Sequence, residues 1–240
     1  MQKDTLYAQP QSAVGDFRFD QRVADVFPDM IQRSVPGYST MIALIGIIAD
    51  QYAQPNTKIY DLGCSLGAAS MAIRHRLTAS GCTLLAVDNS ADMLAKAKTF
   101  LGVEECPVPV QFVEADIRDI EINNASVVVL NFTLQFVPPE DRARLISRIY
   151  DGMLPGGILL LSEKVILNAE PASIQNDLHI AFKKAQGYSD LEIAQKRSAL
   201  ENVMRLDSVN DHLSRLADAG FGTREVWYQC LNFQSLLAVK

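Results

Sequence analysis

The sequence predicts an α/β fold built on a parallel sheet that helices cover on both faces. Between residues 58 and 162, short apolar runs alternate with segments of helical periodicity. We expect strands at 58–62, 83–88, 110–113, 126–132 and 158–162, of which the fourth is almost wholly apolar. Continuous apolar strands that alternate with helices are typical of parallel sheets buried on both faces.

The remaining elements follow from apolar spacing and from helix breakers. Helices are expected at 41–52, 68–77, 91–101 and 139–153, with Pro55 after the first and Pro155 after the last. Residues 168–205 have helical character without a strand pattern, and 209–219 predicts a further helix. Strands at 225–230 and 235–239 predict an antiparallel terminal hairpin, which brings the sheet to seven strands.

The composition is that of one globular domain. The chain has 240 residues, of which 48% are hydrophobic and 21% charged, so it can bury a core without disulfides or structural metals. We expect a single domain over 1–240, with an N-terminal cap over about 1–38 and a helical insertion over about 165–205. The net charge of −6 argues against a surface that grips nucleic acid throughout.

Targeting and metal-binding patterns are not evident. The four cysteines and three histidines lack the spacing of a metal site or a disulfide framework, so no metal is expected. Residues 1–14 are polar, unlike a signal peptide, and no apolar run approaches the ~18 residues of a membrane span. We therefore expect a cytoplasmic protein that contacts neither a membrane nor nucleic acid directly.

A glycine-containing loop follows the first predicted strand. It reads Asp61-Leu62-Gly63-Cys64-Ser65-Leu66-Gly67, and such a loop lets backbone N–H groups approach a ligand at a helix N-terminus. Asp88 ends the second strand at the place where an acid accepts hydrogen bonds from a ribose diol. Together they predict a nucleoside ligand. The alternatives are a tight turn without a ligand and an acid that only caps the following helix.

The spacing of the glycines disfavours a dinucleotide, because it does not fit G-x-G-x-x-G. The acid before the first glycine, the G-x-x-x-G loop and the terminal hairpin instead resemble the class I S-adenosylmethionine-dependent methyltransferase fold, over roughly 40–240. In that fold Asp116 and Ile117 would contact the adenine, and Asn131 would lie near the sulfonium. An amide in the apolar fourth strand needs polar partners, which favours a role in the site.

Four stretches of the sequence resemble one particular family within that fold. Residues 26–38 (VFPDMIQRSVPGY), 61–67 (DLGCSLG), 128–136 (VVLNFTLQF) and 195–198 (QKRS) together resemble the carboxy-S-adenosylmethionine synthase family, over nearly the whole chain. The resemblance implies that S-adenosylmethionine and prephenate are converted to carboxy-S-adenosylmethionine and phenylpyruvate. The product would serve a tRNA uridine carboxymethyltransferase that modifies the wobble position.

The resemblance also assigns residues. Arg197 would hold the new carboxylate and would reach across from the partner subunit of a homodimer, which makes it the expected catalytic residue. The ligand-binding positions implied for S-adenosylmethionine or its carboxylated form are Tyr38, Gly63, Cys64, Ser65, Asp88, Asn89, Asp116, Ile117, Asn131 and Arg197.

The residues that bind prephenate stay open at this point. Arg18, Arg22 and Arg33 are candidates for a second prephenate carboxylate, and His179 is a further group that could approach the substrate. Two other functions also stay open: an ordinary small-molecule methyltransferase, and a non-catalytic partner protein that only binds S-adenosylmethionine. The sequence indicates no base for a methyl acceptor, and the matched loop and Arg197 argue against a lost activity.

Overall fold

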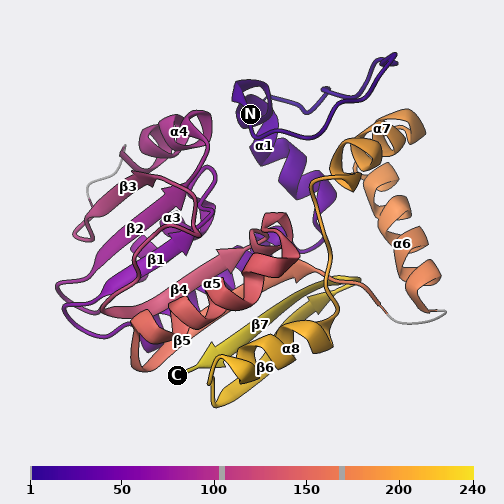
Figure 1. Cartoon of the computed structure of the whole chain (residues 1–240). Coiled ribbons are helices and arrows are strands. Elements are labelled where there is room, and N and C mark those ends of the chain that lie inside the picture. The colour runs from indigo at the N-terminus through magenta and orange to yellow at the C-terminus, as the bar shows by residue number, and fades with distance from the viewer. Residues whose placement is uncertain (1, 103–105, 168–170) are drawn as a thin grey trace.

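A single seven-stranded sheet forms the centre of the protein in the computed structural model, which describes residues 2–102, 106–167 and 171–240 (Figure 1). The strand order is β3-β2-β1-β4-β5-β7-β6. The strands are β1 (Lys58–Leu62), β2 (Thr83–Asp88), β3 (Val110–Glu114), β4 (Ala125–Asn131), β5 (Met153–Lys164), β6 (Thr223–Cys230) and β7 (Phe233–Val239).

The pairing confirms the predicted fold class. β1 pairs with β2 and β4 in parallel, as β2 does with β3 and β4 with β5. β7 runs antiparallel to β5 and to β6, so the last two strands form the predicted hairpin. The carboxyl ends of β1, β2, β4 and β5 consequently meet at one edge of the sheet.

Helices cover both faces, as the apolar strands predict. Val128 and Leu130 of β4 pack in a core with α5 and α8, whereas Val127 and Val129 pack on the opposite face with α2, α3 and α4. Figure 1 shows α5 and α8 in front of the sheet. The helices are α1 (Gln21–Ser34), α2 (Tyr38–Tyr52), α3 (Ala68–Arg74), α4 (Ala91–Gly102), α5 (Pro139–Gly152), α6 (Pro171–Ala185), α7 (Asp190–Glu201) and α8 (Val209–Asp218), with a short 3₁₀ turn η1 (Leu134–Phe136).

The N-terminal cap contains a helix that the sequence analysis did not assign. The side chain of Asp20 accepts a hydrogen bond from the backbone N–H of Val23 and begins α1. Pro28 lies inside this helix and obscures it in the sequence, because proline normally interrupts a helical pattern. The cap is fixed to α7, since the N–H of Phe17 donates to the carbonyl of Ala199 at 2.9 Å.

The segment predicted as helical over 168–205 forms two helices, α6 and α7. Gly187 adopts a φ of 85° between them, a left-handed conformation that suits glycine, and Ser189 begins α7 with a capping box. Residues 168–170, the predicted start of the segment, lie outside the described residues. Figure 1 shows α6 and α7 standing with α1 beyond the end of the sheet.

A buried arginine joins this end of the sheet to the chain after α7. Arg142 of α5 is fully buried; its guanidinium donates to the carbonyls of Val137 and Arg205 and pairs with Asp207 at 2.8 Å. Burial alone would raise the pKa of Asp207, but Arg142 and Arg215 outweigh it and the pKa is lowered. The guanidinium of Arg142 therefore fixes the backbone that follows η1, and its own charge is paired with Asp207.

Replacing Asp207 by Asn should destabilise the protein by about 3 kcal/mol, because it leaves the charge of Arg142 buried without its carboxylate. Chemical denaturation at pH 7 measures this. Asp218→Asn, on the exposed surface of α8, is the matched control and should change the free energy of unfolding by less than about 0.5 kcal/mol. Equal effects of the two substitutions would contradict the role of the buried pair.

Candidate functional site

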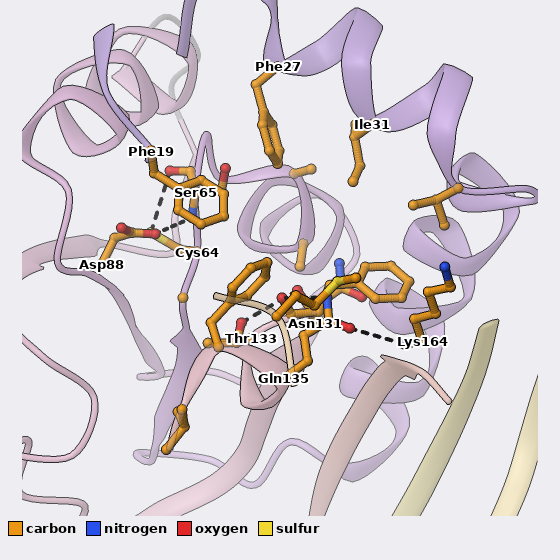
Figure 2. A pocket seen from close by; sticks show the side chains of 18 of the residues that line it. Phe19, Phe27, Ile31, Cys64, Ser65, Asp88, Asn131, Thr133, Gln135 and Lys164 are labelled. Atoms are coloured by element: carbon orange, nitrogen blue, oxygen red, sulfur yellow. Dashed lines mark hydrogen bonds between the residues drawn. The ribbon is translucent and has the colours of Figure 1, made fainter. Parts of the chain in front are cut away.

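A cavity of about 450 Å³ lies at the carboxyl ends of the central strands (Figure 2). Its floor comes from the loops that follow β1, β2, β3 and β4, and residues of α1, α6 and α7 line the opposite side. Aromatic rings form much of its wall: Phe19, Phe27, Phe132, Phe136 and Phe233. The cavity is thus shaped by the sheet edge and partly covered by the cap and the insertion.

The loop after β1 is held close to its neighbours. Gly63 and Gly67 have φ values of 80° and 83°, and Ser65 has a φ of 51°, which is unusual for a residue with a side chain. A Cβ atom on Gly63 would lie 2.3 Å from Oγ1 of Thr133, so only glycine fits there. The predicted ligand loop is therefore a fixed structure, with Cys64 and Ser65 at the cavity.

Asp88 fixes this loop from the end of β2. One carboxylate oxygen accepts from the N–H of Ser65 at 2.8 Å, and the other accepts from the N–H of Ser90 at 2.9 Å. Burial raises the pKa of Asp88. A carboxylate has about four acceptor positions, so Asp88 can serve the loop and still accept from a ribose diol in the cavity. The helix that follows is capped by Ser90, whose hydroxyl accepts from the N–H of Met93.

Asn131 lines the cavity and has a buried side-chain oxygen that accepts no hydrogen bond in the described structure. It ends β4. A buried polar atom left unpaired costs free energy that a ligand donor would recover. The unmet acceptor is what the sequence analysis expects of a binding residue at this strand end.

Cys64, Tyr38 and Asp61 lie at the same part of the cavity. Burial raises the pKa of the Cys64 thiol strongly, so this cysteine stays protonated and is no nucleophile. Burial likewise raises the pKa of Tyr38. Asp61, in the loop motif but not among the predicted ligand positions, accepts from the hydroxyl of Ser70 at 2.6 Å, and burial raises its pKa to about 6. It adds an acidic group for the amino group of a ligand.

The predicted adenine-binding positions lie along the loop that follows β3. Asp116 and Ile117 line the cavity, and Ile117 is buried. Asn89, the position expected at the ribose, follows β2 and lines the cavity as well. Both carboxylate oxygens of Asp116 already accept from Arg118, at 3.0 and 2.7 Å, and these hydrogen bonds lower the pKa of Asp116. Asp116 can therefore accept from an adenine amino group only with the lone pairs that Arg118 leaves free.

Arg197 does not line the cavity of its own chain. Its side chain is exposed on α7 and donates to Asn176 of α6 at 3.2 Å. Burial lowers the pKa of Lys164 and of His179, and the charge of Arg197 lowers both further, so Arg197 stands close to the insertion side of the cavity.

The three arginines proposed for a prephenate carboxylate also lie away from the cavity. Arg18 is exposed, and Arg22 is exposed and paired with Asp20. Arg33 is buried but bound to Asp29 and stacked on the ring of Tyr188. None of the three lines the cavity, although Nη2 of Arg33 has no hydrogen-bond partner in the described structure.

Lysines, which the sequence analysis missed, supply the positive charge instead. Lys164 ends β5, Lys183 lies on α6 and Lys196 on α7, and all three line the cavity. A sequence signal existed, because Lys164 comes two residues after the predicted strand at 158–162 and Lys183 comes four residues after His179 on one helix face. Only the packing of the insertion brings the three together.

His179 lies at the cavity, as the sequence analysis considered. Its Nε2 is 2.8 Å from the carbonyl oxygen of Ser34, and its ring packs edge-on against Phe233 at a centroid distance of 4.9 Å. Burial lowers its pKa to about 3, so the imidazole is neutral at physiological pH. It therefore shapes the wall without adding charge.

Within residues 2–102, 106–167 and 171–240, no three His, Cys, Asp or Glu side chains lie close enough together to form a metal site. None of the helices described has both the length and the hydropathy that a bilayer span requires.

Replacing Asn131 by Leu should weaken S-adenosylmethionine binding by about 1–3 kcal/mol, because a ligand donor would lose its acceptor. The free energy of unfolding without ligand should stay constant or rise, since the substitution removes a buried unpaired oxygen. Calorimetric titration and thermal unfolding measure the two quantities on the same sample. Binding that is unaffected would remove Asn131 from the site.

Comparisons with known proteins agree with this geometry. A family model described as "Methyltransferase domain" matches residues 59–157. Solved structures share the fold: a putative O-methyltransferase from Nostoc punctiforme has a TM-score of 0.66 at 14% identity, covering 92% of this chain and 59% of that one. A putative methyltransferase from Methanococcus maripaludis has a TM-score of 0.60 at 17% identity, covering 96% of this chain and 97% of that one.

Curated relatives are far more similar. The carboxy-S-adenosyl-L-methionine synthase of Vibrio cholerae is 57% identical over 239 residues, which cover 99% of this chain and 97% of the relative. The synthase of Aeromonas hydrophila is 58% identical over 239 residues, with 99% and 96% covered. The loop after β1, Asp88 and Asn131 thus belong to a cavity on a methyltransferase fold, and the chain is a member of the carboxy-S-adenosyl-L-methionine synthase family.

Proposed function

We propose that this protein converts S-adenosylmethionine and prephenate into carboxy-S-adenosylmethionine and phenylpyruvate. The observation that carries the proposal is the division of the cavity by charge. Asp61 and Asp88 lie at the nucleoside side, where Asp116 is paired with Arg118. Lys164 and Lys183 lie at the insertion side and have no anionic partner in the described structure. A second substrate with carboxylates suits the basic side, and methyl transfer by itself requires no such cations.

The reaction balances without a protein nucleophile. Prephenate loses carbon dioxide and hydroxide as its ring becomes aromatic, and the hydroxide takes a proton from the sulfonium methyl group to give water. The methylene carbon of the resulting ylide then forms a bond to the carbon of carbon dioxide. Such a step needs exclusion of bulk water, which the phenylalanine walls favour. The protonated Cys64 has no part in it.

The proposal includes a homodimer in which Arg197 enters the cavity of the partner subunit. Two observations support this: Arg197 is exposed and lies outside its own cavity, and α6, which packs on α7, carries exposed apolar side chains. Ile174 and Leu178, one turn apart on α6, are 62% and 50% exposed. A second copy that covered this face would bring cationic guanidinium groups to the new carboxylates.

The product would serve a tRNA uridine carboxymethyltransferase, in the cytoplasm and without contact between this protein and tRNA. The net charge of −6 supports the last point. An ordinary methyltransferase is the second candidate, because the structural relatives with the same fold include methyltransferases.

One assay separates the two candidates. The purified protein is incubated with S-adenosylmethionine and prephenate, and the nucleosides are identified by mass spectrometry. The proposal expects a species heavier than S-adenosylmethionine by one carbon dioxide, formed only with prephenate. S-adenosylmethionine that stays unchanged in the presence of prephenate would contradict the proposal and leave the methyltransferase as the candidate.

Subunit mixing tests the role of Arg197. Arg197→Ala and Asp88→Asn should each be inactive alone. Mixed dimers should recover roughly a quarter of the activity, because half of them pair the two variants and one of their two cavities is intact. If Arg197 served its own cavity, no intact site could form and the mixture would stay inactive. Size-exclusion chromatography with light scattering verifies that both variants are dimers.

A further inference from the structure

Two lysines at the basic side of the cavity have no anionic partner in the described structure. Lys164 and Lys183 line the cavity, and neither forms an ion pair with any described residue. Lys196, by contrast, lies 3.0 Å from the hydroxyl of Ser34 and 3.7 Å from the carboxylate of buried Asp4. The first two lysines are therefore the cations that a ligand can use.

The charged forms of Lys164 and Lys183 are disfavoured by burial and by neighbouring positive charges. Burial is the main reason that the pKa of Lys183 falls to about 7, and the charges of Lys196, Lys164 and Arg197 lower it further. Burial and the charge of Arg197 likewise lower the pKa of Lys164. The carboxylate of Asp4 acts on Lys183 in the opposite direction but does not outweigh these effects. Like charges held together in a cavity indicate that an anion binds between them.

The position of the lysines separates them from the nucleoside. Figure 2 shows Lys164 and Asp88 at opposite sides of the cavity, with Asn131 between them. The ammonium of Lys164 lies 5.8 Å from the centroid of Phe233, and Phe132 packs edge-on against the same ring. A six-membered ring that carries a carboxylate on a short side chain therefore fits this side, with its ring among the phenylalanines and its side-chain carboxylate at the lysines.

We infer that Lys164 and Lys183 bind the carboxylate of the second substrate that the product retains, which in prephenate is the carboxylate of the 2-oxo side chain. The inference rests on the proposed function. A cation that held the departing carboxylate would stabilise the bound substrate more than neutral carbon dioxide, and would therefore slow the release. A cation on the retained carboxylate anchors substrate and product equally and leaves the departing group free.

This assignment has a consequence for the second carboxylate. With the side chain anchored at the lysines, the ring carboxylate is directed toward Asn131 and the sulfonium side of the cavity. Carbon dioxide would then be released next to the methyl carbon that captures it, which replaces diffusion by proximity.

Phenylpyruvate tests the inference, because it carries only the retained carboxylate and its binding needs no turnover. The variants are Lys164→Met and Lys183→Met, which keep the length of the side chain and remove the charge. Lys184→Met is the control: Lys184 neighbours Lys183 on α6, is exposed, and pairs with Asp190 outside the cavity. Calorimetry measures phenylpyruvate binding to protein loaded with S-adenosylhomocysteine at pH 7.

Each cavity variant should bind phenylpyruvate about 10- to 100-fold more weakly, the range for a lost hydrogen bond to a charged group. Binding of S-adenosylmethionine should change less than about twofold, and the control should match the unaltered protein in both. Unchanged phenylpyruvate binding in both variants would overturn the inference. An equal loss of both ligands would also overturn it, because the lysines would then be structural.

Proton uptake provides a readout that a structural role would not alter. At pH 8 Lys183 is mostly neutral in the free protein, and a bound carboxylate should raise its pKa and draw in a proton. The charged groups that act on it are Lys164 of β5, Lys196 and Arg197 of α7, and Asp4. Titrations in buffers of different ionisation enthalpy should detect this uptake in the unaltered protein and little of it in Lys183→Met.

The outcomes distinguish this inference from the proposed function. If the unaltered protein makes no carboxy-S-adenosylmethionine from prephenate, the proposed function fails, and phenylpyruvate binding still decides whether the lysines form an anion site. If turnover occurs but the lysine variants lose only kcat with prephenate and keep phenylpyruvate affinity, the lysines serve the departing carboxylate. That result would overturn the inference alone.

Discussion

The parallel alignment of β1, β2, β4 and β5 governs where the residues of the cavity lie. It brings four strand ends to one edge, where the backbone of the following loops is no longer paired within the sheet. The loop after β1, Asp88 and Asn131 acquire their positions from that edge alone. Because the strands are buried on both faces, their register is set by packing and the edge is rigid.

A rigid edge still leaves one side of the cavity open, and the cap and the insertion partly cover it. They do so with buried polar contacts as well as apolar ones. Asp4 accepts from the hydroxyl of Tyr188 at 2.5 Å, and Arg33 of α1 donates to the carbonyl of Gln186. These contacts tie segments that lie more than 150 residues apart in the sequence, at separations of 184 and 153 residues. These contacts hold the insertion, which carries Lys183 and Lys196, against the N-terminal cap.

The turn between β4 and α5 connects the two parts. Glu163, fully buried next to Lys164, accepts from the N–H groups of Leu134 and Gln135 at 2.8 and 3.1 Å. Burial raises its pKa to about 8. Arg142 holds the same turn from the other side through the carbonyl of Val137. Neither group touches the cavity, yet both fix the turn that carries Gln135 and Phe136 into its wall.

Local sequence patterns are sufficient to predict the sheet and the side of the cavity that the loops after β1 and β2 form. The strand pattern, the loop over 61–67, Asp88 and Asn131 are local signals, because strand ends and tight turns are dictated by residues next to one another. The helix α1 was missed because Pro28 interrupts its pattern, and the insertion was given as one helical segment although Gly187 divides it.

The positive charge of the cavity depends on contacts that form when the chain folds. Arg18, Arg22 and Arg33 suited the chemistry by residue type, but they are exposed or already paired. Lys164 and Lys183, which carry no motif, are brought together by the packing of α6 against the sheet end. Whether a lysine is free to bind depends on which anions lie within a few ångströms of it, and that is a property of the folded chain rather than of its neighbours in sequence.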